Sequence, residues 1–170
     1  MFSISVVTLA ILSCLNIVLT LAVARRLNRQ SPPVSPNDDL AAPLPVPGTP
    51  IGTFATTTTS GEPIGTKNLS GRTLVGFFTV GCPPCERLKP EFRAFADTFP
   101  GGRDQVLAVI SGGAGDPDAL AGQLDDIARV IVEPPAGQVS TAFGIDAFPA
   151  VCLLKGNVVT AAEFDLESLK

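Results

Sequence analysis

The sequence predicts an α/β domain with a mixed central sheet between layers of helices, preceded by a transmembrane helix and a proline-rich linker. The first 24 residues contain no Asp, Glu, Lys or Arg, which is typical of a membrane-spanning segment. Proline is abundant in the next stretch, and strand and helix signals alternate from residue 51 onward. These three observations divide the chain into an anchor (1–24), a linker (25–50) and a folded domain (51–170).

The anchor would reach about 36 Å as a helix, enough to cross a hydrocarbon core of about 30 Å. A cleaved signal peptide is the alternative, because Ala22-Val23-Ala24 resembles a small-x-small cleavage site. The apolar run is longer than a signal peptide needs, and no basic region precedes it, so we favour an anchor. The positive-inside rule would keep the side that carries Arg25, Arg26 and Arg29 in the cytoplasm.

The linker contains seven prolines between residues 31 and 50. Such a composition favours extended polyproline conformations over a helix or a central strand. We interpret it as a semi-rigid spacer, with a proline-rich ligand for a partner module as the alternative.

The first half of the folded domain predicts a hairpin, a buried strand and a helix. Residues 54–58 and 63–66 flank a turn, and the apolar run 73–80 has the composition of a strand buried on both faces. Residues 84–99 then place one apolar side chain per helical turn on a single face. That face consists of Leu88, Phe92, Phe95 and Phe99.

The second half continues the alternation and ends in a hairpin. Asp116-Pro117 is a helix-starting pair, and Leu120, Leu124 and Ile127 extend an apolar face beyond it. Gly144 is expected to end a short helix over 138–143, and Gly156-Asn157 is expected to turn the final hairpin. The strands are expected at 105–110, 129–133, 151–154 and 158–161, the last two being antiparallel edge strands of a mainly parallel sheet.

Composition excludes several kinds of chemistry. The chain has no His, so it has no Ser-His or Cys-His catalytic pair and no imidazole ligand for a metal or haem. Three of its 12 basic residues precede residue 31, whereas all 16 acidic residues follow it. The folded domain is therefore acidic, which argues against a nucleic-acid partner.

Cys82-Pro83-Pro84-Cys85 is the motif that carries chemistry, because it joins the buried strand to the amphipathic helix. The N–H groups and dipole of a helix N-terminus stabilise a thiolate, so Cys82 is expected to be exposed and activated. Cys85 lies one turn into the helix and is expected to be more buried and less acidic. Prolines are tolerated between them because the first helical turn loses no donor.

Two other interpretations of the motif remain open. A zinc site would need two further ligands, for which only Cys14 and Cys152 are left, and Cys14 falls in the predicted anchor. A persistent structural disulfide without turnover is the second alternative. We interpret Cys152 as a small buried core residue and Cys14 as a packing residue.

Residues 73–90, TLVGFFTVGCPPCERLKP, resemble the active-site strand and helix of the thioredoxin superfamily. Pro90 matches the helix-kinking proline of that family, and Phe148-Pro149 matches its cis-proline, which would lie against Cys82. The resemblance covers about residues 51–165 and is closest to membrane-anchored TlpA/ResA-like proteins and methylamine dehydrogenase accessory proteins. It implies a thioredoxin-like three-layer sandwich.

The chain departs from the family at several positions. Gly76 replaces the buried Asp that accepts a proton in thioredoxin, which leaves Glu86 or water as substitutes, and Gly81 replaces the usual Trp. Thr79 is placed as in peroxiredoxins, but Val75 replaces their proline and their Arg cannot be assigned.

The resemblance implies a thiol-disulfide oxidoreductase in which Cys82 is the nucleophile and Cys85 the resolving thiol. Phe148 and Pro149 would bind an extended protein substrate, with Pro83 and Pro84 beside them. No dissociable cofactor or metal is expected, and a membrane redox partner would restore the dithiol. The family works outside the cytoplasm, so we expect this location despite the Arg cluster. A non-catalytic binding module and a thiol peroxidase are the alternatives.

Overall fold

The computed structural model describes Ser13, residues 44–113 and residues 115–169. The predicted transmembrane helix and nearly all of the predicted linker lie outside these residues, so both remain predictions. In the part that is described, no helix is long and apolar enough to cross a membrane. The described residues from 44 onward belong to the second of the chain's two compact units, which begins at Ala42.

The elements follow one another in the order that the sequence predicts, with boundaries shifted by one or two residues at most ends. A 3-10 turn follows β2, another precedes β4, and a third, Glu167–Leu169, follows β7. The strands and helices are β1 (Ala55–Thr57), β2 (Pro63–Gly65), β3 (Arg72–Thr79), α2 (Pro83–Asp97), β4 (Val106–Ser111), α3 (Pro117–Ala121), β5 (Arg129–Glu133), α4 (Gln138–Phe143), β6 (Ala150–Lys155) and β7 (Val158–Glu163).

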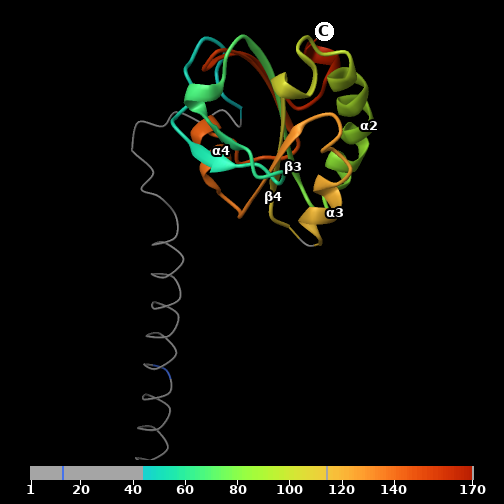
Figure 1. Ribbon diagram of the computed structural model, residues 1–170. Helices are drawn as coiled ribbons and strands as arrows, with labels where there is room; N and C mark the ends of the chain where they lie inside the picture. The colour runs from blue at the N-terminus through green and yellow to red at the C-terminus, as the bar shows by residue number, and fades with distance from the viewer. Residues whose placement is uncertain (1–12, 14–43, 114, 170) are drawn as a thin grey trace, which may run out of the picture. The chain divides into compact units, whose positions relative to one another are not determined.

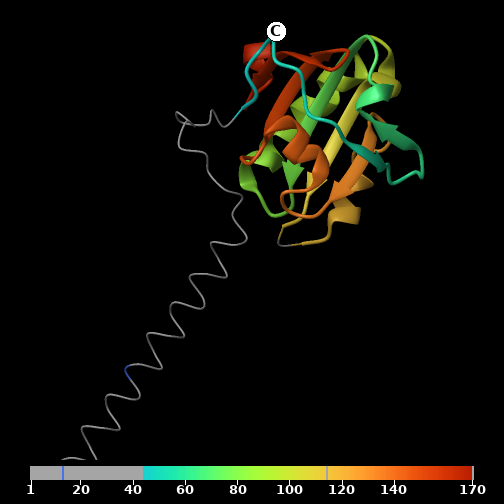
Figure 2. The same cartoon turned by 90° about the vertical axis from the view of Figure 1, so that its left-hand side faces the viewer.

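Five strands form one mixed sheet in the order β5-β4-β3-β6-β7 (Figures 1 and 2). β3, β4 and β5 are parallel, whereas β6 is antiparallel to β3 and β7 is antiparallel to β6. β1 and β2 form a separate hairpin. The central position of β3 matters for the site, because this strand leads directly into the Cys-Pro-Pro-Cys motif.

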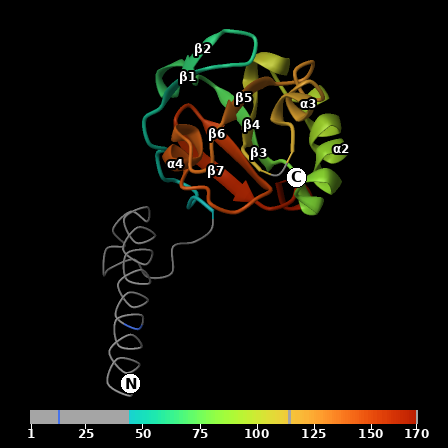
Figure 3. The same cartoon turned by 90° about the horizontal axis from the view of Figure 1, so that it is seen from below.

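Two apolar cores lie on opposite faces of the sheet, so the predicted three-layer α/β architecture is confirmed. α2 and α3 cover one face and α4 covers the other (Figure 3). β3 supplies both cores because its side chains alternate: Leu74 and Phe78 point to the α2 side, and Val75 and Phe77 to the α4 side. This two-sided burial explains the unbroken apolar run of the strand.

Two expectations from the sequence need correction. The helix expected to continue to Ile127 ends at Ala121, and irregular turns follow Gly122, although Leu124 is buried as expected. Gly in a helix interior is unfavourable by about 1 kcal/mol, which favours termination at this point. β6 is also not an edge strand, since it lies between β3 and β7.

The N-terminus of α4 is held by a buried carboxylate. Glu133, at the end of β5, is 6% exposed and accepts hydrogen bonds from Val139 N (2.8 Å), Ser140 N (2.9 Å) and Ser140 Oγ (2.5 Å). These bonds satisfy amide groups that have no partner within the helix. They tie α4 to the end of β5.

Glu133→Gln is expected to lower the free energy of unfolding by about 2–3 kcal/mol, because the new amide N–H₂ can accept nothing from these donors. Glu163→Gln is the matched control, since Glu163 is only partly buried and forms none of these contacts. Urea unfolding followed by circular dichroism measures both changes. An equal, small change in the two variants would contradict the capping role.

Candidate active site

Cys82 is the N-cap residue of α2. Its backbone is extended (φ −99°, ψ 109°), and the helix proper begins with Pro83 and Pro84. The Sγ atom accepts a hydrogen bond from the Cys85 backbone N–H at 3.3 Å. Prolines fit this first turn because their fixed φ is helical and no intrahelical donor is lost. Cys82 as a residue is partly exposed, in line with the exposure that the sequence predicts.

Cys85 lies one turn further along and is buried, with 1% exposure, in the core beneath α2. Burial raises the pKa of its thiol to about 12, and the hydrogen bond and charge of Cys82 add to the effect. A backbone hydrogen bond from Thr79 partly opposes the rise in pKa. The structure therefore pairs a partly exposed cysteine with a buried one whose thiol has a raised pKa.

The loop that precedes β6 reaches the nucleophile. The peptide bond between Phe148 and Pro149 is cis, and Cys82 Sγ lies 3.9 Å from the Phe148 carbonyl oxygen. The structure thus brings Cys82, Cys85, Phe148 and Pro149 together from two segments that lie more than 60 residues apart.

The space occupied by a buried Asp in thioredoxins is filled here by aromatic rings. A Cβ atom on Gly76 would lie 2.5 Å from the Phe92 ring and 2.8 Å from the Phe78 ring. Those two rings pack edge to face, with centroids 5.2 Å apart. The sequence-based suggestion that Glu86 substitutes for the Asp gains no support, because Glu86 pairs with Lys89 at 2.6 Å on the exposed side of α2.

The other candidate residues take structural positions. Cys152 is fully buried on β6 in the core beneath α4, across the sheet from Cys85, so it cannot complete a zinc site with the motif. Burial raises the pKa of its thiol to about 12. The Thr79 hydroxyl donates a hydrogen bond to the Gly112 carbonyl at 2.9 Å, so Thr79 contacts the loop that follows β4. Cys14 lies outside the described residues.

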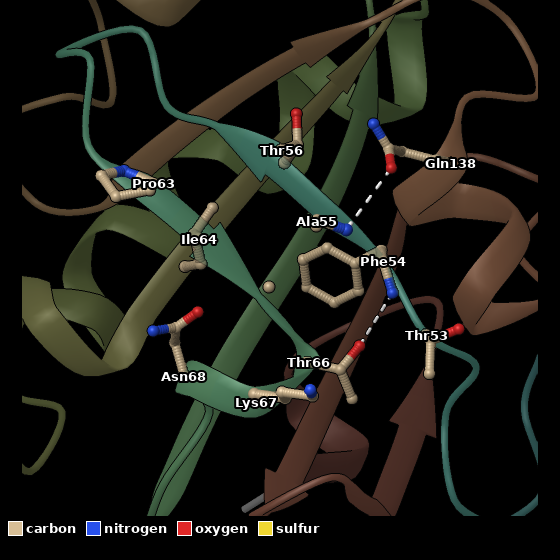
Figure 4. A pocket seen from close by; sticks show the side chains of 11 residues that line it. Thr53, Phe54, Ala55, Thr56, Pro63, Ile64, Thr66, Lys67, Asn68 and Gln138 are labelled. Atoms are coloured by element: carbon tan, nitrogen blue, oxygen red, sulfur yellow. Dashed lines mark hydrogen bonds between the residues drawn. The ribbon is translucent and has the colours of Figure 1, made fainter.

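Two hollows in the surface of the protein were not predicted from the sequence. One, of about 500 Å³, lies over the β1–β2 hairpin and α4, and no residue that lines it carries a sulfur (Figure 4). The other, of about 390 Å³, borders the motif and includes Arg87 and Phe164 with the cis-proline loop. No local pattern singles out Phe164, because its neighbours come from other segments.

No family model matches the chain. It is 34% identical over 56 residues to the sporulation thiol-disulfide oxidoreductase A of Bacillus subtilis (strain 168). The match covers 33% of this chain and 34% of that protein, so the chain aligns with about a third of the length of this relative.

Solved structures of related shape extend the comparison over most of the described residues. StoA from Bacillus subtilis has a TM-score of 0.52 at 22% identity, covering 72% of this chain and 96% of that one. A secreted Mycobacterium tuberculosis disulfide oxidoreductase homologous to E. coli DsbE has a TM-score of 0.51 at 17% identity (66% and 83% covered). The exposed lipoprotein thioredoxin Etrx1 of Streptococcus pneumoniae has a TM-score of 0.51 at 16% identity (66% and 88% covered).

The sheet order, the motif at the start of α2 and the cis-proline beside it define a thioredoxin-like fold. In sequence, the chain is similar over 56 residues to a thiol-disulfide oxidoreductase, and in fold it is similar to solved structures of such proteins.

Proposed function

We propose that this chain exchanges disulfides with protein substrates through Cys82 and Cys85. The observation that carries the proposal is the pairing of a partly exposed sulfur with a buried one at the start of α2, bordered by the cis-proline loop. The Cys82 sulfur is accessible to a partner, whereas Cys85 is reached from within the protein. This asymmetry suits sequential exchange better than a permanent structural bridge.

Two exchanges complete the reaction. The Cys82 thiolate attacks one sulfur of the substrate disulfide, so a Cys82–substrate bond forms as the substrate S–S bond breaks and releases one thiolate. Cys85 then attacks Cys82 Sγ and releases the second substrate thiolate. Two electrons pass to the substrate, its thiolates take up the two protons, and a Cys82–Cys85 disulfide remains.

The backbone of Phe148, a partly buried residue beside Cys82, is proposed to pair with an extended substrate. Proline at position 149 contributes no N–H, so pairing would use the groups of Phe148. Pro83 and Pro84 are both exposed and would form the adjoining rim of the binding surface.

The surroundings of the domain are proposed from the sequence and the relatives. We propose a membrane anchor over residues 1–24 and a domain outside the cytoplasm, as suggested by the secreted and lipoprotein relatives. A membrane-bound dithiol reductase would then restore Cys82 and Cys85, and exported enzymes or cytochromes would be suitable substrates. Alkaline phosphatase fused after Lys170 should be active in cells, whereas an inactive fusion would indicate a cytoplasmic domain.

Cys85→Ser is expected to accumulate mixed disulfides through Cys82, because the second exchange is removed while the first remains. Cells that express the variant are quenched with acid, and adducts are resolved on non-reducing gels and identified by mass spectrometry. Cys82→Ser/Cys85→Ser is the matched control, which should trap nothing. Absence of adducts with Cys85→Ser, at normal protein level, would overturn the proposed activity.

A further inference from the structure

A groove of about 390 Å³ begins beside the reactive sulfur and lies between α2 and the segment that follows β7. α2 contributes Pro84, Arg87 and Leu88, and the opposite wall is Phe164. Phe148 and Pro149 lie at the end that is closest to Cys82.

The groove is continuous with the candidate active site. Pro84 belongs to the Cys-Pro-Pro-Cys motif, and the Phe148 carbonyl oxygen is 3.9 Å from Cys82 Sγ. A peptide joined to Cys82 through a disulfide can therefore extend past the mouth of this groove. Successive residues of an extended chain advance about 3.3 Å each, so side chains near the reacting cysteine can reach it.

The lining of the groove includes the charged Arg87, Glu91 and Asp165, but it also presents apolar surface to water. Phe164 is 42% exposed, and the only other large apolar side chain exposed to this degree among the described residues is Val46, which lines neither this groove nor its neighbour. When a partner covers an exposed aromatic ring next to a reactive group, the burial of apolar surface stabilises the complex.

The shape of the hollow favours a chain over a compact ligand. Glu91 lines this groove and also a second hollow of about 460 Å³ further along α2, which includes Phe95 and Leu166. The two hollows therefore adjoin along the helix, and a polypeptide segment can follow them away from Cys82.

We propose that this groove is a specificity subsite, with Phe164 as its determinant, that receives an apolar side chain within about three residues of the substrate cysteine attacked by Cys82. This inference rests on the proposed function, since it concerns the substrates of that exchange. The occupant is an extended polypeptide, and the contact is the face of Phe164 against an aromatic or branched aliphatic side chain.

The test uses the full-length reduced protein in a single turnover with disulfide-linked peptide dimers. Two nine-residue peptides each carry one cysteine and differ only two residues beyond it, where one has Phe and the other Ser. The wild type is expected to reduce the Phe peptide about tenfold faster, since one apolar contact typically discriminates by this order. Bis(2-hydroxyethyl) disulfide has no side chain that could enter the groove, so its rate of reduction measures the disulfide exchange step alone.

Phe164→Ser is expected to reduce the preference to less than about threefold while the rate with bis(2-hydroxyethyl) disulfide stays unchanged. Phe164→Leu should retain most of the preference, and Val46→Ser, the matched control, should retain all of it. An undiminished preference in Phe164→Ser, or no preference in the wild type, would overturn the subsite. If the wild type reduces none of the three disulfides, both the subsite and the proposed function are overturned.

Discussion

Iodoacetamide is expected to modify Cys82 in the folded, reduced protein while Cys85 and Cys152 stay unmodified. Only thiolates react at useful rates, and burial raises the pKa of both other thiols to about 12. At pH 8 a thiol of pKa about 12 is ionised about one part in 10⁴, against about one in ten for an ordinary thiol of pKa about 9. Ionisation alone therefore slows Cys85 and Cys152 by about a thousandfold, and burial adds to this.

The pH dependence of the reaction with iodoacetamide follows from the raised pKa values of Cys85 and Cys152. Because both pKa values lie far above neutrality, any reaction of Cys85 or Cys152 should rise about tenfold per pH unit between pH 7 and 9. Peptide mapping by mass spectrometry, at several times and pH values, gives the rate at each cysteine. The same protein unfolded in urea provides the reference rates.

The variant Cys82→Ala distinguishes between the causes of the raised pKa of the Cys85 thiol. Burial is the largest cause and remains in the variant, but the hydrogen bond and charge of Cys82 disappear. Cys85 should consequently react faster than in the wild type, whereas Cys152, across the sheet, should not change. Rapid modification of Cys85 in the folded wild type would contradict the two-thiol arrangement on which the proposed exchange depends.

Local patterns predicted the parts of the fold that depend on nearest neighbours along the chain. The apolar face of α2 repeats at helical spacing, and its members Leu88 and Phe92 are buried as expected. The Cys-Pro-Pro-Cys motif and its position between strand and helix were also evident, since strand, cap and helix are contiguous.

The family resemblance placed the Phe148-Pro149 loop beside Cys82, but other features that depend on distant segments were not predicted. The expected position of β6 was wrong, because hairpin pairing is local, whereas insertion beside β3 depends on the whole sheet. Glu133 ends a strand in the sequence, and its role as a cap emerges only when α4 packs back onto it. Phe164 gains its place from α2 and the cis-proline loop, which lie far from it in sequence.

At position 76 the chain differs most from the thioredoxins that it resembles. Thioredoxins have a buried Asp at this position, whereas this protein has Gly76 and no space for an acidic side chain. The Phe92 and Phe78 rings occupy the space into which a side chain at residue 76 would point. Both rings are fully buried, so room for a side chain here would require repacking of the core beneath α2. Cys85 therefore has no buried carboxylate from position 76 to accept its proton.

Gly76→Asp is expected to lower the free energy of unfolding by more than about 4 kcal/mol. Overpacking a filled core costs about 1–3 kcal/mol, and burying a carboxylate without a partner costs several more. That loss approaches the whole stability of a typical domain, about 5–15 kcal/mol, so much of the variant should unfold at low denaturant concentration. Urea titration followed by far-ultraviolet circular dichroism measures the shift of the midpoint.

Gly122→Asp is the matched control, because Gly122 is exposed, has a helical backbone and would place its Cβ no closer than 3.6 Å to another atom. Its stability should stay within about 1 kcal/mol of the wild type. Gly76→Ala, which adds the Cβ without a charge, should fall between the two at about 1–3 kcal/mol. A midpoint for Gly76→Asp equal to that of Gly122→Asp would mean that the core beneath α2 can accommodate an acid. The proton acceptor of thioredoxins could then be restored here by a single substitution.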